Sequence, residues 1–332
     1  MRFRHCLFVA SFLVAALAGA CRDGAERAAG AQGVDGAQVD AASHPIGPDA
    51  SWGGGGPIGD AGAAPGGELA IATWNIEEFP LDVTTPERVA EIILDLDLDL
   101  IAAQEIASEA AFELMVEGLE GYDAVLSHHE YEDGTYQKTG FIYRDSVLSI
   151  THISLPFRHE QPECFEEGTS FEPFPRPPLH VSFRALEADY EFTAINVHHK
   201  AFFPPCPNDC RERRACANRH LEDYVRDQVE RFSPNVIVLG DFNEHLDNDA
   251  DLDPFAHWDS DRYHVLTSAL GPDDYSYVDR QSLIDHAIVT EAMTSTFGDD
   301  AVEVIYLDRE MDDYTRYVSD HLPVMMRFDP SR

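Results

Sequence analysis

Six short polar motifs lie in a fixed order between residues 73 and 321 of this 332-residue chain. They are rich in carboxylates, imidazoles and side-chain amides, and in chain order they read Thr73-Trp74-Asn75-Ile76-Glu77, Ala103-Gln104-Glu105, Asn196-Val197-His198, Gly240-Asp241-Phe242-Asn243, Ile284-Asp285-His286 and Ser319-Asp320-His321. Each lies at the end of an apolar, strand-like run, and polar groups at strand ends on one rim of a buried sheet can converge on a single pocket. Histidines, carboxylates and amides in one pocket suit the metal-assisted hydrolysis of a phosphoester.

Strands and helices alternate along the chain in a way that would position these motifs. Strands are expected at residues 69–74, 99–104, 141–143, 181–183, 192–197, 283–289, 301–306 and 323–328, with a further strand that ends at Gly240. Helices are expected from Thr85, which would act as the N-cap ahead of Pro86, and over residues 112–119 and 215–232. Residues 156–178 are proline-rich and typical of a loop. The pattern by itself indicates only an α/β or α+β fold.

The ordered set of motifs resembles the endonuclease/exonuclease/phosphatase superfamily, whose members share the deoxyribonuclease I-like fold. The resemblance covers roughly residues 68 to 329, and the order of the six motifs is more specific than any one of them. It implies a four-layer α/β/β/α sandwich with the motifs on one rim. It also implies a hydrolase that acts on phosphoester bonds.

The resemblance implies a divalent cation in the pocket, Mg²⁺ first, with Mn²⁺ or Ca²⁺ as alternatives. Glu105 ends an apolar run where an unpaired charge would be costly, and it corresponds to the central metal ligand. Asn75 matches the asparagine that helps to place metal and nucleophile, and Asp320 would lie beside the metal. Glu77 either joins the metal site through water or is a solvated acid beside Glu78.

The same resemblance assigns the catalytic roles. Asp241 would orient or deprotonate the attacking water, and Asn243 would hold a phosphate oxygen. His198 corresponds to the first histidine, which donates to a non-bridging oxygen as charge builds in the transition state. His321 corresponds to the second histidine, with Asp285 as the carboxylate that fixes its tautomer.

Residues next to these positions are expected to face the core or to depart from the family pattern. Strand alternation points Phe242 away from the pocket, favours His198 over His199 as the inward imidazole, and makes His286 structural. In the secreted deoxyribonucleases an acid partners the first histidine, whereas Gln137 occupies the matching place here. A strict deoxyribonuclease I assignment is weaker for that reason.

Positively charged side chains are scarce, and the formal net charge of the chain is −38. Such a field opposes polyanions and anionic membranes, so a phosphate-bearing substrate must be held by local cations or by metal. Arg176, between prolines, resembles a phosphate-contacting arginine of the family. Lys138 and Lys200 are the only lysines and adjoin the motifs, while Arg213 either contacts phosphate or balances nearby carboxylates such as Glu212.

The first 67 residues of the sequence predict export. Residues 1–21 have a basic start, a short apolar stretch and small residues before Cys21, as in a bacterial lipoprotein signal peptide. A lipidated Cys21 would anchor the protein to the cell envelope, in the outer membrane, and ordinary cleavage with release is the alternative. Residues 22–67 are rich in Gly, Ala, Asp and Pro and are expected to be a disordered tether. Residues 68–332 would form one catalytic domain, expected to be a monomer.

Two further clusters leave alternatives open. Cys164, Cys206, Cys210 and Cys216 indicate two disulfides with three possible connectivities, and the alternative is a four-cysteine zinc site. Five acidic or amide residues between Asp247 and Asp253 form either a solvated loop or an oxygen cage for Ca²⁺.

The resulting prediction is an exported Mg²⁺-dependent phosphodiesterase, an endonuclease or exonuclease that hydrolyses extracellular DNA or RNA. A sphingomyelinase-type phospholipase, with residues 202–205 as its apolar loop, or a small-molecule phosphatase acting on inositol or sugar phosphates is the alternative within the same chemistry. The net charge counts against long polyanions and so favours that alternative. An inactive surface-binding module predicts an eroded pocket, whereas all six motifs are intact.

Overall fold

The computed structural model describes residues 67–131, 134–166, 169–202, 210–246 and 252–332. Several predicted features lie outside these described residues, namely the signal sequence with Cys21, the tether up to Gly66, Cys206, the segment 203–205 and positions 247–251 of the acidic cluster. None of the helices formed by the described residues combines the length and apolar character that crossing a membrane requires.

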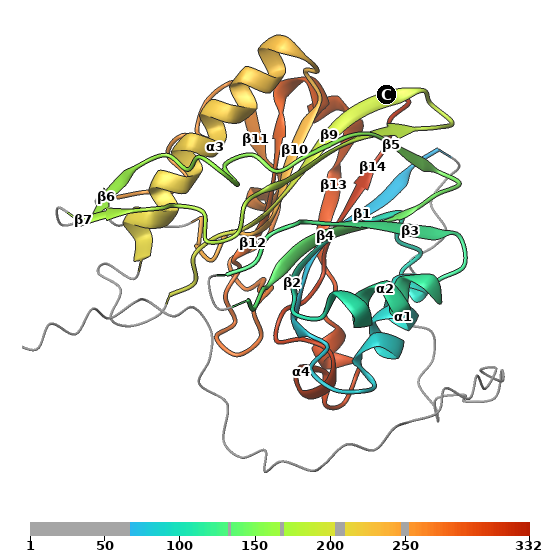
Figure 1. The fold of residues 1–332 in the computed structure, drawn as a ribbon. Helices are drawn as coiled ribbons and strands as arrows, with labels where there is room; N and C mark the ends of the chain where they lie inside the picture. The colour runs from blue at the N-terminus through green and yellow to red at the C-terminus, as the bar shows by residue number, and fades with distance from the viewer. Residues whose placement is uncertain (1–66, 132–133, 167–168, 203–209, 247–251) are drawn as a thin grey trace, which may run out of the picture. The chain divides into compact units, whose positions relative to one another are not determined.

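Two six-stranded mixed sheets form the body of the domain (Figure 1). The first sheet has the order β13 (Phe297–Val304), β14 (Val324–Phe328), β1 (Leu69–Phe79), β2 (Leu100–Ile106), β4 (Lys138–Arg144) and β3 (Tyr122–Leu126). The second has the order β11 (Tyr263–Val265), β12 (Asp285–Thr290), β10 (Val236–Asp241), β9 (Tyr190–His198), β8 (Leu179–Ala185) and β5 (Leu148–Ser154). Apolar side chains from the inner faces of both sheets, among them Phe141, Phe183 and Phe328, form one continuous buried cluster.

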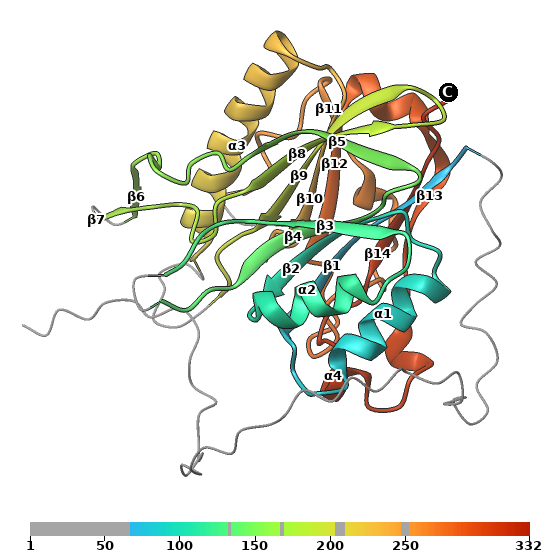
Figure 2. The same cartoon turned by 45° about the vertical axis from the view of Figure 1, so that its right-hand side comes forward.

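Helices cover the outer face of each sheet (Figures 1 and 2). The helices α1 (Thr85–Asp95) and α2 (Glu109–Glu117) pack on the first sheet in a second cluster, and α3 (Arg211–Arg231) packs on the second sheet in a third. The remaining helical segments are short: η2 (Leu266–Ala269), η3 (Glu291–Thr296), η4 (Leu307–Arg309) and α4 (Tyr314–Tyr317). Three apolar layers separate four layers of secondary structure, which confirms the α/β/β/α sandwich.

Strand direction explains why the six motifs meet. The strands β1 and β2 are parallel, and so are β9 and β10, so each of these pairs ends at a common rim. The strands β12 and β14 run antiparallel to β10 and β1, so they begin at that rim. Motifs that end four strands and motifs that begin two others are therefore brought to one edge of the sandwich.

The two sheets are joined near this rim by a buried amide pair. Gln104 Nε2 on β2 donates to Asn196 Oδ1 on β9 at 2.8 Å. Asn196 Nδ2 in turn donates to the carbonyls of Ala103 and Gly140 at 2.9 and 2.8 Å. These bonds cross from one sheet to the other, so they fix the relative position of the motifs that follow.

Gly240 permits close contact between β9 and β10. It has φ +148°, and a Cβ at this position would lie 2.0 Å from the carbonyl oxygen of Val197. No side chain fits there, so glycine is required for the strand pair that carries His198 and Asp241.

Several expected boundaries are corrected. Thr84 is the N-cap of α1, while Thr85 is the first helical residue and donates its hydroxyl to the carbonyl of Tyr317. The third helix begins at Arg211 rather than at residue 215. Short strands β3, β5 and β11 were not predicted.

The proline-rich segment 156–178 is not wholly a loop. It contains a small hairpin of β6 (Cys164–Glu166) and β7 (Thr169–Phe171), which projects beside α3 (Figure 1). A disulfide joins Cys164 to Cys216 of α3 with a Cα–Cα distance of 6.4 Å, and Cys210 is also disulfide-bonded. Disulfide bonding of these three cysteines excludes the four-cysteine zinc site.

Candidate active site

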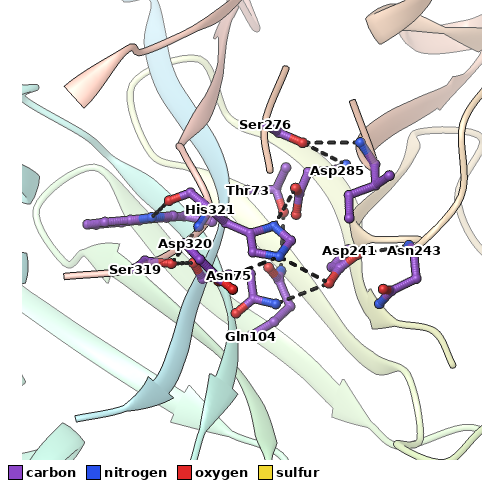
Figure 3. A network of polar contacts seen from close by, with 12 residues as sticks. Thr73, Asn75, Gln104, Asp241, Asn243, Ser276, Asp285, Ser319, Asp320 and His321 are labelled. Carbon is purple, nitrogen blue, oxygen red and sulfur yellow. Dashed lines mark hydrogen bonds and ion pairs between the residues drawn. The ribbon is translucent and has the colours of Figure 1, made fainter. Parts of the chain in front are cut away.

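The rim where the strands converge contains a polar cavity of about 360 Å³. Residues from the second, fourth, fifth and sixth motifs line it, together with the start of α3 and the segments after β9, after β10 and before β12. The lining residues are Glu105, Ala201, Phe202, Arg211, Arg214, Asp241, Asn243, Glu244, His245, Tyr277, Arg280, Ser282, Ile284, Asp320 and His321. Figure 3 shows a polar network to which the lining residues Asp241, Asn243, Asp320 and His321 belong.

Asp241 is the centre of that network. Its Oδ2 accepts from Asn75 Nδ2 at 3.0 Å, and its Oδ1 accepts from the backbone N–H of Asn243 at 2.8 Å (Figure 3). Asn75 Nδ2 also donates to Glu105 Oε1 at 3.2 Å. Asn75 therefore holds two carboxylates together across the gap between the sheets.

Glu105 is oriented by the backbone around it. It has a positive φ of 61°, and its Oε2 accepts from the N–H of Glu78 at 3.1 Å. His198 Nε2 lies 3.6 Å from both Glu105 Oε1 and Asp241 Oδ2. The other ring nitrogen of His198, Nδ1, is buried and has no hydrogen-bond partner among the described residues.

His321 also lies beside Asp241 and is held by Asp285. Its Nδ1 lies 2.8 Å from Asp285 Oδ2, and its Nε2 lies 4.0 Å from Asp241 Oδ2 and 3.9 Å from Asp320 Oδ1. The N–H of Asp285 donates to Ser276 Oγ at 3.1 Å, which fixes the carboxylate end of the pair. The imidazole therefore presents Nε2 to the cavity.

Backbone contacts tie this histidine to the first motif. Ser319 Oγ donates to the carbonyl of Asn75 at 2.6 Å and accepts from the N–H of His321 at 2.9 Å. The indole of Trp74 donates to the carbonyl of His321 at 3.2 Å. A displacement of β1 would therefore move His321 as well.

The two histidines differ in protonation. Burial, reinforced by Arg176 and His321, lowers the pKa of His198 well below its usual value. Burial also opposes protonation of His321, but Asp285, Asp241 and Asp320 outweigh it and raise the pKa of His321 well above the usual value. At neutral pH His198 is neutral and His321 is a cation, so the two rings are suited to different tasks.

The acids of the cavity compete for ionisation. Burial and then the Asp285 charge raise the pKa of Asp241 to about 7. Burial, and less strongly Glu77 and Glu105, raises the pKa of Asp320 to about 7, against the lowering effect of His321. Burial is the larger cause in both cases, so each carboxylate is removed from water next to other acids, and its charge is only partly balanced by His321.

This unbalanced charge fits a divalent metal. Ligand atoms of Glu105, His198 and Asp241 lie within 4.8 Å of one another, and so do those of Asp241, Asp285 and His321. Carboxylate oxygens are the preferred donors for Mg²⁺, so Glu105 and Asp241 are suited to hold the ion.

Asn75 and Glu77, both predicted to help hold the metal, lie beside this set and make hydrogen bonds within the protein. Asn75 directs its amide nitrogen toward the carboxylates of Glu105 and Asp241, and its oxygen accepts from the N–H of Glu77 at 3.0 Å. Glu77 Oε2 accepts from the N–H of Asp320 at 2.8 Å. In this arrangement Asn75 and Glu77 orient the acidic loops.

The described lining of the cavity includes none of the four predicted substrate-binding cations. Arg176 is buried and donates to Gln137, which donates in turn to Glu78. Lys138 Nζ pairs with Glu109 at 2.6 Å.

The other two cations of that prediction also lie away from the lining. Lys200 is buried, and its carbonyl accepts from Arg214 at 3.1 Å. The Arg213 guanidinium lies 6.0 Å from the Phe171 ring at the β6–β7 hairpin.

Other cations and an aromatic ring take their place at the cavity. Arg211, Arg214 and Arg280 line it, and Tyr277 contributes a ring 5.0 Å from that of His321. Arg280 and Tyr277 were not predicted from the sequence. The signal that could have revealed them is their place in the short segment just before the Ile284-Asp285-His286 motif.

The residues assigned to the core are found there. Phe242 is fully buried, and His199 Nε2 lies 3.2 Å from Asn218 Oδ1 on α3. His286 Nε2 donates to the carbonyl of Glu244 at 2.9 Å, and its Nδ1 lies 3.0 Å from Thr267 Oγ1. These two histidines are thus satisfied within the fold.

Residues 72–321 match the sequence model of the Endonuclease/Exonuclease/phosphatase family. The chain belongs to this family. Its members hydrolyse phosphoesters and generally use divalent metals, so this protein is a phosphoesterase. No curated protein sequence matches the chain.

Solved structures share the fold at low identity. The catalytic domain of human Nocturnin with bound sulfate is similar at 14% identity and TM-score 0.56, over 79% of this chain and 94% of that one. A humanized D. rerio TDP2 is similar at 16% identity and TM-score 0.57, over 79% of this chain and 99% of that one. The mannosyl-6-phosphatase of Bacteroides thetaiotaomicron is similar at 16% identity and TM-score 0.53, over 77% of this chain and 98% of that one. These likenesses establish the deoxyribonuclease I-like fold and leave the substrate open.

Proposed function

We propose that the protein is an exported, metal-dependent phosphodiesterase that hydrolyses nucleic acid. The observation that carries the proposal is the arrangement around Asp241. A buried carboxylate of raised pKa lies between a neutral His198 and a cationic His321, beside the acidic group of Glu105. This arrangement supplies a base, a neutral donor and a positive charge on three sides of one reaction centre.

Each residue has a task in the hydrolysis. Asp241 orients a water molecule and accepts its proton, because its carboxylate is fixed by Asn75 and by the N–H of Asn243 beside both histidines. The water oxygen attacks phosphorus, and the bond from phosphorus to the leaving oxygen breaks. His321, kept protonated by Asp285, stabilises the negative charge that develops, and neutral His198 donates to a non-bridging oxygen.

The metal would be held by Glu105, next to Asp241. A bound divalent cation would neutralise charge on the phosphate and polarise its phosphorus–oxygen bonds. Asn75 Nδ2 holds the carboxylates of Glu105 and Asp241 next to each other through hydrogen bonds of 3.2 and 3.0 Å.

Substrate choice is the finer part of the proposal. The net charge of −38 opposes polyanions, but Arg280 at the cavity gives a local attraction for phosphate, to which Arg211, paired with Glu244 at 3.4 Å, adds less. Hydrolysis of a sugar or inositol phosphate is a second candidate, because a cavity of about 360 Å³ is the size of a small-molecule site.

Export is supported by the disulfide between Cys164 and Cys216, since such bonds persist in oxidising compartments. We place the protein in the bacterial cell envelope through Cys21, or in the medium if that cysteine carries no lipid. The assignment is tested by radiolabelled palmitate incorporation into wild-type protein and Cys21→Ala, where absence of label in the wild type argues for release.

The function is tested by incubating the full chain with Mg²⁺, Mn²⁺ or Ca²⁺ and a panel of substrates. Plasmid DNA, RNA, sphingomyelin, mannose 6-phosphate and inositol phosphates are compared, with His321→Ala as the blank. Cleavage of DNA or RNA that disappears in the blank is expected. Activity confined to the lipid or the small phosphates would refute the nucleic-acid assignment.

A further inference from the structure

An aromatic ring and a guanidinium lie together at the mouth of the cavity. Phe202 follows β9 by four residues and lines the cavity, as does Arg280 from the segment before β12. The guanidinium carbon of Arg280 lies 5.8 Å from the centroid of the Phe202 ring. We call Phe202 and Arg280 the mouth pair.

The mouth pair leaves apolar surface exposed beside the reaction centre. Phe202 is 40% exposed, whereas Phe242, the aromatic residue directly after β10, is fully buried. The Tyr277 ring, against His321, lines the same cavity and extends this aromatic surface toward the catalytic residues. A planar apolar group that covered Phe202 would remove this surface from water.

The chemistry of the pair favours a planar ring that is itself joined to phosphate. An aromatic face stacks on a nucleobase whatever its sequence, and an arginine adds both a stacking plane and a positive charge. An acyl chain would gain nothing from the guanidinium, and a sugar has no π face. Among phosphoesters, nucleotides present both features.

We propose that Phe202 and Arg280 form a stacking subsite for an unpaired nucleobase beside the scissile phosphate, so that the enzyme selects single-stranded nucleic acid. The inference rests on the proposed function and specifies its substrate. A base inside a duplex is already stacked on both faces and can reach Phe202 only by leaving the helix. Duplex DNA also carries one charge per about 1.7 Å of axis, which a protein of net charge −38 repels more strongly than a single strand.

The experiment uses the full chain in saturating Mg²⁺ and three oligonucleotides of one sequence. The first is single-stranded, the second is the same strand in a duplex, and the third is single-stranded with abasic residues around the cleaved bond. Phe202→Ala, Phe202→Trp and Arg280→Ala are compared with Phe232→Ala, a control at an aromatic side chain that is 76% exposed at the end of α3. Melting temperatures establish that each variant is folded.

For the wild type we expect a clear preference for the base-bearing single strand. Phe202→Ala should raise KM for that strand about 10-fold with little change in kcat, and it should leave the abasic strand unaffected. Phe202→Trp should restore the wild-type KM, Arg280→Ala should reduce the preference, and Phe232→Ala should change nothing.

Two results would overturn the inference, and they are distinguishable. If the wild type cleaves duplex and single strand equally, or if Phe202→Ala affects base-bearing and abasic strands alike, the stacking subsite is wrong and the phosphodiesterase stands. If no oligonucleotide is cleaved while sugar, inositol or lipid phosphates are, the proposed function fails and the inference fails with it.

Discussion

Replacing Asp285 by asparagine removes the charge that keeps His321 protonated while preserving shape. The Asp285 Oδ2–His321 Nδ1 distance is 2.8 Å, and both residues are buried. A hydrogen bond of this kind between charged groups contributes about 1.5–3 kcal/mol, which corresponds to a rate factor of about 10 to 150. The asparagine can also present its amino group to Nδ1 and favour the wrong tautomer. We therefore expect kcat to fall by about 100- to 1,000-fold, with KM little changed.

The assay is steady-state hydrolysis by wild type and Asp285→Asn between pH 5 and 9, with melting temperature as the check on folding. Loss of the Asp285 charge lowers the pKa of His321, so the alkaline limb of the kcat profile should move to lower pH. Asp99→Asn is the control, because Asp99 lies beside the opposite end of β2, where it accepts from Ala70 and Arg144. A folded Asp285→Asn protein that loses less than fivefold in kcat, with an unshifted profile, would refute the assigned role of this pair.

Three further predictions concern the metal, the strand pair and acid stability. Glu105→Gln should weaken Mg²⁺ binding at least about 100-fold in isothermal calorimetry, and unchanged affinity would remove Glu105 from the metal site. Gly240→Ala places a Cβ 2.0 Å from the Val197 oxygen and should lower the free energy of unfolding by about 3 kcal/mol or more, whereas Gly298→Ala, whose nearest atom is 3.6 Å away, should cost little. Burial lowers the pKa of His286 to about 4, so its contribution to stability is complete above pH 6.5 and is lost as the pH falls toward 4. His286→Gln should therefore show less loss of stability over that range in urea unfolding than wild type, and an identical pH dependence would contradict the shift.

The arrangement of the motifs could be predicted because the strong signals are local. A short run of branched apolar residues such as 236–239 favours a buried strand, and a polar group just beyond such a run lies at the end of that strand. The alternation of Asp241, Phe242 and Asn243 correctly separated the core side chain from the cavity. The sandwich fold followed from the family resemblance and not from the pattern.

The missed elements have weak or non-local signals. The strand β5 lies at a sheet edge, and most of its side chains are partly or fully exposed, so it has no apolar run. The hairpin β6–β7 is fixed to α3 by the Cys164–Cys216 disulfide, and four cysteines alone allow three pairings.

The positions of the predicted substrate-binding cations also depend on contacts between residues far apart in the sequence. Lys138 adjoins a motif in sequence, yet its ammonium pairs with Glu109, 29 positions earlier. Arg280 has no motif of its own and reaches the cavity through the path of the segment before β12. Contacts made by long, flexible side chains depend on tertiary structure, which no local spacing encodes.

The most direct test of the central claim is the initial rate of oligonucleotide hydrolysis after treatment with EDTA, measured as Mg²⁺ is restored. The wild type is compared with His321→Ala at each concentration. We expect no hydrolysis without the ion, a saturable recovery with it, and at least about 100-fold less activity in the variant. Hydrolysis that persists in EDTA, or that is equal in the two proteins, would contradict metal-assisted catalysis at this site.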